Sequence, residues 1–460
     1  MTNKVSVGAI ACAIAMAVAC GEDEALGPGT GGAAGAAGSG ASAGSGGDGG
    51  GTGGGSGSGG SSGAGGSSGG AAGNGASAGA DSGTGGADGG PPKGRLLVAG
   101  TDFFSKTEIA TVDLATNKVS GSVTLNDGDA VPAASSGQAF VLERTNAKLH
   151  HLDAAGQILK SIDVGKAALG LTGSGSTNPV GVVATGTGSS ARAHVLLQTV
   201  NRMAVLDLAA GTVTKTIDLA AYQASGDADG SVDMTSPVLH PSSGRVYFLL
   251  GRIDRTTVAA PSYQLACPSV KALLVAVDTA NDSIVDLNGS AAGEGIELAL
   301  ANPVDLALDA AQDRLLVLSA GCFAPTEGGS TRVGHGVESV ALGSFATSTK
   351  YAAPNQDFLS RLLLRSSGAA LLNSFDPSFA EHWYPWATAT TALGSELGGV
   401  PAAPSLEDEG HLLGVSVATT DAGSTVDVVR YDIGAQSKST LVASPWTGSF
   451  SSVAGTALVR

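Results

Sequence analysis

Three aspartates within one short segment form the most ligand-like group of oxygen atoms in the chain. Asp227, Asp229 and Asp233 surround Gly230, so carboxylates recur at alternate positions around a residue that permits a tight turn. Oxygen ligands at this spacing suit a hard cation such as Ca²⁺. The segment lacks the terminal glutamate of a full calcium loop, and Asp-Gly pairs also form ordinary turns. Calcium is therefore the one candidate cofactor, with a plain turn as the alternative.

A second candidate site is a concentration of aromatic residues in a chain of which only 4% is Phe, Trp or Tyr. The candidate ligand-binding side chains are Phe379, His382, Trp383, Tyr384 and Trp386. Trp and Tyr combine a large apolar area with a polar edge, so such a group could bind a sugar ring or a protein partner. The alternative is a small core that holds this segment in place, and we favour it.

The histidines give no sign of a catalytic centre. They are scattered, and none has ligand spacing to another His, to a Cys or to a carboxylate. His150 and His151 fall in a predicted strand, and His240 precedes a proline in a predicted turn. No set of nucleophile, base and orienting acid can be recognised, so the sequence predicts no catalytic residue.

The elements that would carry these residues follow a tandem repeat. Its clearest copy, Asn302 to Leu318, has two alternating segments joined by a polar turn, which is typical of a β-hairpin. Weaker copies begin near Val131, Asn178, Ser236, Phe358 and Val400. Units of roughly 40 to 70 residues with about four strands each predict β-propeller blades. A pair of β-sandwiches is the alternative, but one pattern in tandem favours the propeller.

The count of predicted second strands gives the number of blades. These strands are expected at Arg95, Gln138, Ala193, Arg245, Arg314, Ala369 and His411. The expected fold is therefore all-β, with seven four-stranded blades. Six or eight blades are the alternatives because the sixth is irregular. Since the domain starts at a second strand, we expect the C-terminal strand, Ser452 to Val459, to complete the first blade and close the ring.

One segment of the first blade resembles a known repeat family. Glu108 to Val119 contains Val-Asp-Leu-Ala-Thr-Asn-Lys-Val, which is similar to the YVTN family of propeller repeats. Echoes of it occur at Val205 to Leu208, Val275 to Asn281 and Arg430 to Ile433. The resemblance covers most of residues 94–460 and is poor between 351 and 399. It implies a propeller, in agreement with the repeat.

The N-terminus has the pattern of a secretory signal. A charged start through Lys4 precedes an apolar stretch, Val5 to Ala19, that is too short to span a membrane comfortably. Small residues followed by Cys20 resemble the lipobox of bacterial lipoproteins, which implies cleavage before Cys20 and acylation of its thiol. The alternative is an ordinary signal with an incidental cysteine. Residues 1–20 are thus predicted to be a lipoprotein signal peptide with its lipidation cysteine.

Residues 21–93 are almost entirely Gly, Ser and Ala. Such a segment cannot bury enough apolar surface to offset the entropy of ordering it, so we expect a disordered linker. A flexible chain of this length has a reach of roughly 45 Å, which would hold a propeller domain at 94–460 clear of a membrane. The composition resembles that of tethers in myxobacterial envelope lipoproteins.

Two cysteines remain in the predicted domain, Cys267 and Cys322. Each follows a predicted second strand, in consecutive blades, so we expect both in loops on one face. An exported protein sits in an oxidising compartment, which favours a disulfide over two buried thiols. The same face should carry three long insertions, at Arg252 to Lys271, Gly321 to Val337 and Asn373 to Pro385.

The net charge and the predicted location limit the partners that this protein can have. The formal charge of -16 argues against nucleic acid or an anionic bilayer surface as partner. The predicted lipidation places the protein in the cell envelope, at the outer membrane, on its periplasmic or surface side, and we expect a monomer. The expected role is a binding or scaffolding module for an envelope protein or glycan. The alternatives are a hydrolase or quinoprotein-like enzyme at the centre of the ring, where Asp305 would be a candidate, and a structural surface-layer component.

Overall fold

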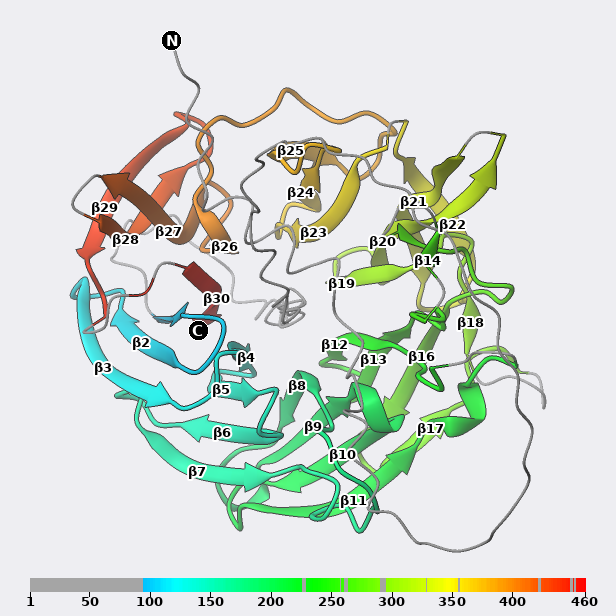
Figure 1. The fold of residues 1–460 in the computed structure, drawn as a ribbon, viewed down its shortest axis with the longest axis horizontal. Helices are drawn as coiled ribbons and strands as arrows, with labels where there is room; N and C mark the ends of the chain where they lie inside the picture. The colour runs from blue at the N-terminus through cyan, green and yellow to red at the C-terminus, as the bar shows by residue number, and fades with distance from the viewer. Residues whose placement is uncertain are drawn as a thin grey trace, which may run out of the picture.

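A computed structural model describes residues 94–460, apart from 226–228, 257, 260–263, 290–294, 328, 355, 421–422, 447–449 and 451. The described residues form blades arranged in a ring around a central axis (Figure 1). The chain is thus an all-β propeller with seven blades, as the repeat predicts. No helix in these ranges is long and apolar enough to cross a membrane. The predicted signal and linker lie outside the described residues.

The first three blades have four strands each. Blade one holds β1(Arg95–Thr101), β2(Thr107–Asp113), β3(Lys118–Leu125) and the last strand, β30(Ser452–Val459). Blade two holds β4(Ala130–Ser135), β5(Gln138–Glu143), β6(Lys148–Leu152) and β7(Ile158–Asp163). Blade three holds β8(Pro179–Thr185), β9(Arg192–Leu197), β10(Arg202–Asp207) and β11(Thr212–Asp218), with the short 3-10 helices η1(Gly188–Ser190), η2(Gln198–Val200) and η3(Ala220–Tyr222).

The later blades are less regular. Blade four holds β12(Met234–His240), β13(Arg245–Leu250), β16(Leu273–Asp278), β17(Ser283–Val285) and β18(Ile296–Glu297), with the separate hairpin β14(Val258–Ala259) and β15(Gln264–Leu265). Blade five holds β19(Pro303–Asp309), β20(Arg314–Thr326), β21(Gly329–Ala341) and β22(Thr347–Ala352). Blade six holds β23(Phe358–Leu364), β24(Ala369–Phe375) and β25(Glu381–Ala387). Blade seven holds β26(Ala402–Leu406), β27(His411–Thr420), β28(Gly423–Asp432) and β29(Ser437–Ala443).

The C-terminal strand closes the ring. β30 pairs antiparallel with β1, from Arg95 opposite Val459 to Thr101 opposite Ser452, and it is the innermost strand of blade one. The two ends of the domain are therefore joined by a backbone ladder, which confirms the predicted closure. The closure leaves neither end of the ring as an open sheet edge.

Alternating apolar residues explain why the sheets stack. Phe140 and Leu142 of β5 are buried against Val195 of β9, in the cluster between blades two and three. Val141, between them in sequence, points the other way and packs with Leu97 and Ile109 of blade one. Because successive side chains in a strand point to opposite faces, each inner strand contributes to two cores.

Polar side chains join the innermost strands of neighbouring blades. Ser236 of β12 donates its hydroxyl hydrogen bond to the Val304 carbonyl of blade five, 3.0 Å away. Asp305 of β19 accepts one backbone hydrogen bond from Leu306 at 2.9 Å and one from Leu362 of blade six at 2.8 Å. Burial raises the pKa of Asp305 to about 6, although these two N–H groups and the Arg361 charge oppose the shift. Asp305 thus holds blades five and six together.

Candidate binding pocket between blades five and six

The aromatic residues of β25 divide between two interfaces. Trp386 packs toward blade five with Leu316 and is 1% exposed. Trp383 packs toward blade seven with Tyr431 and is 3% exposed. Phe379 lies in the turn before the strand and is 44% exposed. The predicted residues therefore do not form one surface platform, because the two-residue period of a strand sends neighbouring side chains to opposite faces. The two tryptophans occupy the cores instead.

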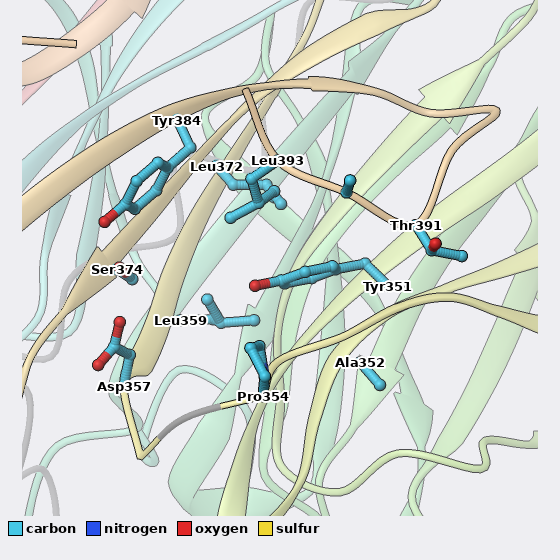
Figure 2. A pocket seen from close by; sticks show the side chains of 11 residues that line it. Tyr351, Ala352, Pro354, Asp357, Leu359, Leu372, Ser374, Tyr384, Thr391 and Leu393 are labelled. Carbon is cyan, nitrogen blue, oxygen red and sulfur yellow. The ribbon is translucent and has the colours of Figure 1, made fainter. Parts of the chain in front are cut away.

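A pocket of about 410 Å³ lies where blades five and six meet. Its residues come from the end of β22, the segment that follows it, β23, β24, β25 and the chain after β25 (Figure 2). The lining is formed by Tyr351, Ala352, Pro354, Asp357, Leu359, Leu372, Ser374, Tyr384, Thr391, Ala392 and Leu393. Only Tyr384 among these belongs to the predicted aromatic group.

Oxygen atoms gather at one end of the pocket. In Figure 2 the hydroxyl of Tyr384 and the carboxylate of Asp357 both point toward Ser374, and the Tyr351 ring lies beside them. The hydroxyl oxygen of Ser374 is buried and has no hydrogen-bond partner in the described structure. Leu359, Leu372 and Leu393 form apolar wall next to this end. A bound molecule would thus meet oxygen atoms at one end and hydrocarbon along the side.

Carboxylates give the polar end a negative potential. Burial, and then Glu396, Asp357 and Asp376, raise the pKa of the Tyr384 phenol. Burial lowers the pKa of His382, but Glu396 at 2.9 Å and Asp376 at 3.6 Å outweigh it, so the pKa is raised overall. His382 stacks on Tyr384 with the ring centroids 6.3 Å apart. Three carboxylates therefore surround the two rings.

One arginine partly offsets these carboxylates. The Arg332 guanidinium lies 4.5 Å from the ring centroid of Phe323 and 5.3 Å from that of Phe358. Burial lowers the pKa of Arg332 to about 10, and Asp357 opposes this shift. Arg332 remains a cation at neutral pH and attracts Asp357.

The irregular end of blade six forms one pocket wall. After β25 the chain returns along that strand without forming a fourth strand, and touches it through the bridge between Trp386 and Leu393. The Gly394 N–H then donates to the Pro385 carbonyl at 2.7 Å. A Cβ atom at Gly394 would lie 2.8 Å from the Pro385 ring, so the close approach needs glycine. This approach brings Leu393 into the pocket wall.

The aspartate segment is engaged by an arginine. Asp233 is 4% exposed, and its carboxylate accepts hydrogen bonds from Arg255 Nε at 2.6 Å and the Ile253 N–H at 2.7 Å. Asp229 accepts the Arg255 N–H at 2.8 Å. Asp227 lies outside the described residues, among which no group of three or more His, Cys, Asp or Glu side chains could hold a metal ion.

Cys267 and Cys322 are joined by a disulfide, with their Cα atoms 4.8 Å apart. Cys267 lies outside the strands, as predicted, but the prediction of a loop is wrong for Cys322. Cys322 is buried within β20, because β20 and β21 continue as one long hairpin beyond the blade. Cys267 follows β15, and its N–H donates to the Phe323 carbonyl at 3.2 Å. The disulfide therefore ties the insertion of blade four to the long hairpin of blade five.

The third predicted insertion is not a long loop. β24 ends at Phe375 and β25 begins at Glu381, so a tight turn joins two paired strands. Sequence reasoning also missed Tyr351, Asp357 and Ser374 as pocket residues. Tyr351 and Ser374 are the next-to-last residues of β22 and β24, and Asp357 directly precedes β23. Nothing local in the sequence marks such a residue as facing the next blade.

No protein-family model and no curated protein matches the chain. Among solved structures, a 6-phosphogluconolactonase-like protein of Bacteroides uniformis is 12% identical, with a TM-score of 0.45, covering 80% of this chain and 100% of that one. Hydrazine synthase of Kuenenia stuttgartiensis is 12% identical, with a TM-score of 0.44, covering 77% and 95%. The dihydro-heme d1 dehydrogenase NirN is 13% identical, with a TM-score of 0.44, covering 80% and 67%. Identities this low transfer no function to this chain.

Proposed function

We propose that this propeller is a binding module that takes an amine-bearing ligand into the pocket between blades five and six. The observation that carries the proposal is the joint position of two tyrosine rings and Asp357 around one end of that pocket. Aromatic faces and a carboxylate together favour a cation over a neutral group. The buried Ser374 hydroxyl supplies a further hydrogen-bond partner at the same end.

The apolar wall indicates the chemistry of the remainder of the ligand. Leu359, Leu372 and Leu393 suit the hydrocarbon chain or ring that carries the amino group. Two envelope components have this chemistry: a lysine side chain of a protein and an amino sugar of a glycan. Both fit the expected protein or glycan partner, and they share the ammonium group that the tyrosines and Asp357 would contact.

The proposed address follows from the sequence. Acylation at Cys20 would anchor the protein in the cell envelope, at the outer membrane, and residues 21–93 would act as the tether. Growth of the producing cells with a labelled fatty acid should give a labelled protein, and Cys20→Ala should abolish the label. Labelling that persists in this variant would contradict the anchor.

The binding experiment compares charged and neutral ligands on the full chain by calorimetry. The probes are Nα-acetyl-lysine methylamide, its neutral norleucine isostere, glucosamine and N-acetylglucosamine. We expect one or both amines to bind and the neutral partners to bind at least tenfold more weakly. Lysine-only binding would indicate a protein partner, and glucosamine-only binding a glycan.

Matched variants locate the site. Asp357→Asn should weaken amine binding by roughly 1 to 2 kcal/mol, about fivefold to thirtyfold, because it removes one charge beside the ligand. Asp313→Asn, in the exposed turn between β19 and β20, is the control and should bind as the native chain does. Equal affinities for amines and their neutral partners would overturn the proposal.

The centre of the ring favours this proposal over the enzyme alternative. Asp305, the candidate for chemistry there, is 5% exposed and accepts backbone hydrogen bonds from Leu306 and Leu362. Both of its carboxylate oxygens are therefore engaged in hydrogen bonds that include the contact between blades five and six. A structural surface-layer role remains the third candidate, and selective amine binding would count against it.

A further inference from the structure

Blade two brings a serine, a histidine and a glutamate into one hydrogen-bonded line. His150 Nδ1 lies 2.9 Å from Ser161 Oγ, and His150 Nε2 lies 2.8 Å from Glu143 Oε2. The three residues come from β7, β6 and β5, which are adjacent strands of one sheet. His150 stands opposite Ser161 in the ladder between β6 and β7. A hydroxyl, an imidazole and a carboxylate thus lie in series, each within hydrogen-bonding reach of the next.

The partners of His150 assign its protons. Glu143 is 4% exposed, and burial raises the pKa of its carboxyl, but hydrogen bonds from His150 and Asn146 outweigh burial and hold the pKa below its usual value. An ionised carboxylate only accepts hydrogen bonds, so Nε2 of His150 carries a proton. In the neutral ring Nδ1 then carries no proton and accepts a hydrogen bond from the Ser161 hydroxyl. This is the orientation in which the ring can act as a base toward serine.

The backbone adds a donor beside the serine. The Val164 N–H donates to the Ala147 carbonyl at 2.9 Å, which makes that pair a hydrogen-bonded one. Hydrogen-bonded and open pairs alternate along an antiparallel ladder, so the pair of His150 and Ser161 is open. The Ser161 N–H therefore points away from β6, toward the outer edge of the blade. In chymotrypsin-type serine proteases the N–H of the nucleophile is one of the donors that stabilise the oxyanion.

We propose that Ser161 is an acyl-accepting nucleophile, with His150 as its general base and Glu143 as the residue that positions the ring. Ser161 Oγ forms a bond to the ester carbonyl carbon, and the bond from that carbon to the leaving oxygen breaks. The serine proton passes through His150 to the departing alcohol, and water then hydrolyses the acyl-serine by the reverse path. Ser161 is exposed on the outermost strand, so an ester in solution can reach its hydroxyl. We assign a small ester with a good leaving group as the substrate class.

An alkyl fluorophosphonate tests the nucleophile on the full chain. Ser161 Oγ would bond to phosphorus, fluoride would leave, and mass spectrometry would locate the adduct. We expect labelling at Ser161 about 100-fold faster than at Ser439, which is an exposed serine of β29 opposite Arg430 and has no histidine partner in the ladder. Ser161→Ala should lose the adduct and Ser439→Ala should keep it. An adduct elsewhere, or labelling of both serines at one rate, would overturn the proposal.

A second pair of variants tests the base without removing a buried residue. In Ser161→Cys the thiol would face His150 Nδ1, whereas in Ser348→Cys, at an exposed position of β22, it would face only the Ser339 hydroxyl. Iodoacetamide should alkylate position 161 at least tenfold faster than position 348, measured on the separated peptides. Equal rates in two variants that melt as the native chain does would show that the line of residues is structural. The result is independent of amine binding at the other pocket, so either proposal can fail alone.

Discussion

Asp305 offers a test of how the inner strands are held together. We consider Asp305→Asn, which keeps the shape of the side chain and removes its charge. The native carboxylate accepts the N–H groups of Leu306 and Leu362. The carboxyl keeps both oxygens as acceptors even when it is protonated, whereas the amide has only one acceptor oxygen. One of these N–H groups therefore loses its partner in the variant, at a cost of about 1 to 3 kcal/mol.

The charge of the buried Asp305 carboxylate has the opposite effect, because removing it favours the variant at neutral pH. The pKa of Asp305 rises from 3.8 to about 6 on folding. A carboxyl with a raised folded pKa contributes stability that is full below the unfolded value and is lost as the pH rises through 6. A shift of about two units corresponds to about 3 kcal/mol that the native protein loses between acidic and neutral pH. The variant carries no such group and loses nothing from it.

Unfolding by guanidinium chloride at several pH values between 4 and 8 measures the balance. We expect Asp305→Asn to be less stable than the native chain at pH 4, and the difference to shift by about 2 to 3 kcal/mol in favour of the variant by pH 8. Glu327→Gln, at an exposed carboxyl, is the control and should match the native chain throughout. A difference that stays constant with pH, or grows with it, would refute the reasoning and show that Arg361 keeps the carboxylate ionised at little cost.

Three further outcomes are expected. Trp386→Ala should lower the free energy of unfolding by about 3 to 5 kcal/mol, because the indole is 1% exposed in the core between blades five and six. A loss of less than about 1 kcal/mol, measured by denaturant unfolding, would contradict that burial. Reduction of Cys267 and Cys322 should cost up to about 4 kcal/mol, and a thiol titration of the unfolded, unreduced protein that finds both free would exclude the bridge. Excess calcium or a chelator should leave the melting temperature unchanged, because Arg255 and backbone N–H groups engage Asp229 and Asp233; a rise with calcium would restore the metal site.

Local patterns account for the parts of the fold that the sequence predicted. The hairpin at Asn302 to Leu318 could be recognised because a strand alternates every two residues and its turn residues are adjacent in the chain. The end of the chain could be matched to the missing first strand by the same pattern. The prediction was wrong where strands ran on: Cys322 lies within β20 rather than in a loop, because the apolar and small residues after Leu318 continue the pairing with β21.

The sequence by itself determined a propeller of tandem hairpins closed by its last strand, because each of these features depends on residues close together in the chain. Only the tertiary structure decided which side chains meet. Tyr351 and Tyr384 share a pocket because two blades pack face to face, and Ser161 reaches His150 because the register of β7 against β6 sets them opposite. Strand register and blade packing are sums of many contacts distant in sequence, so no single segment specifies them.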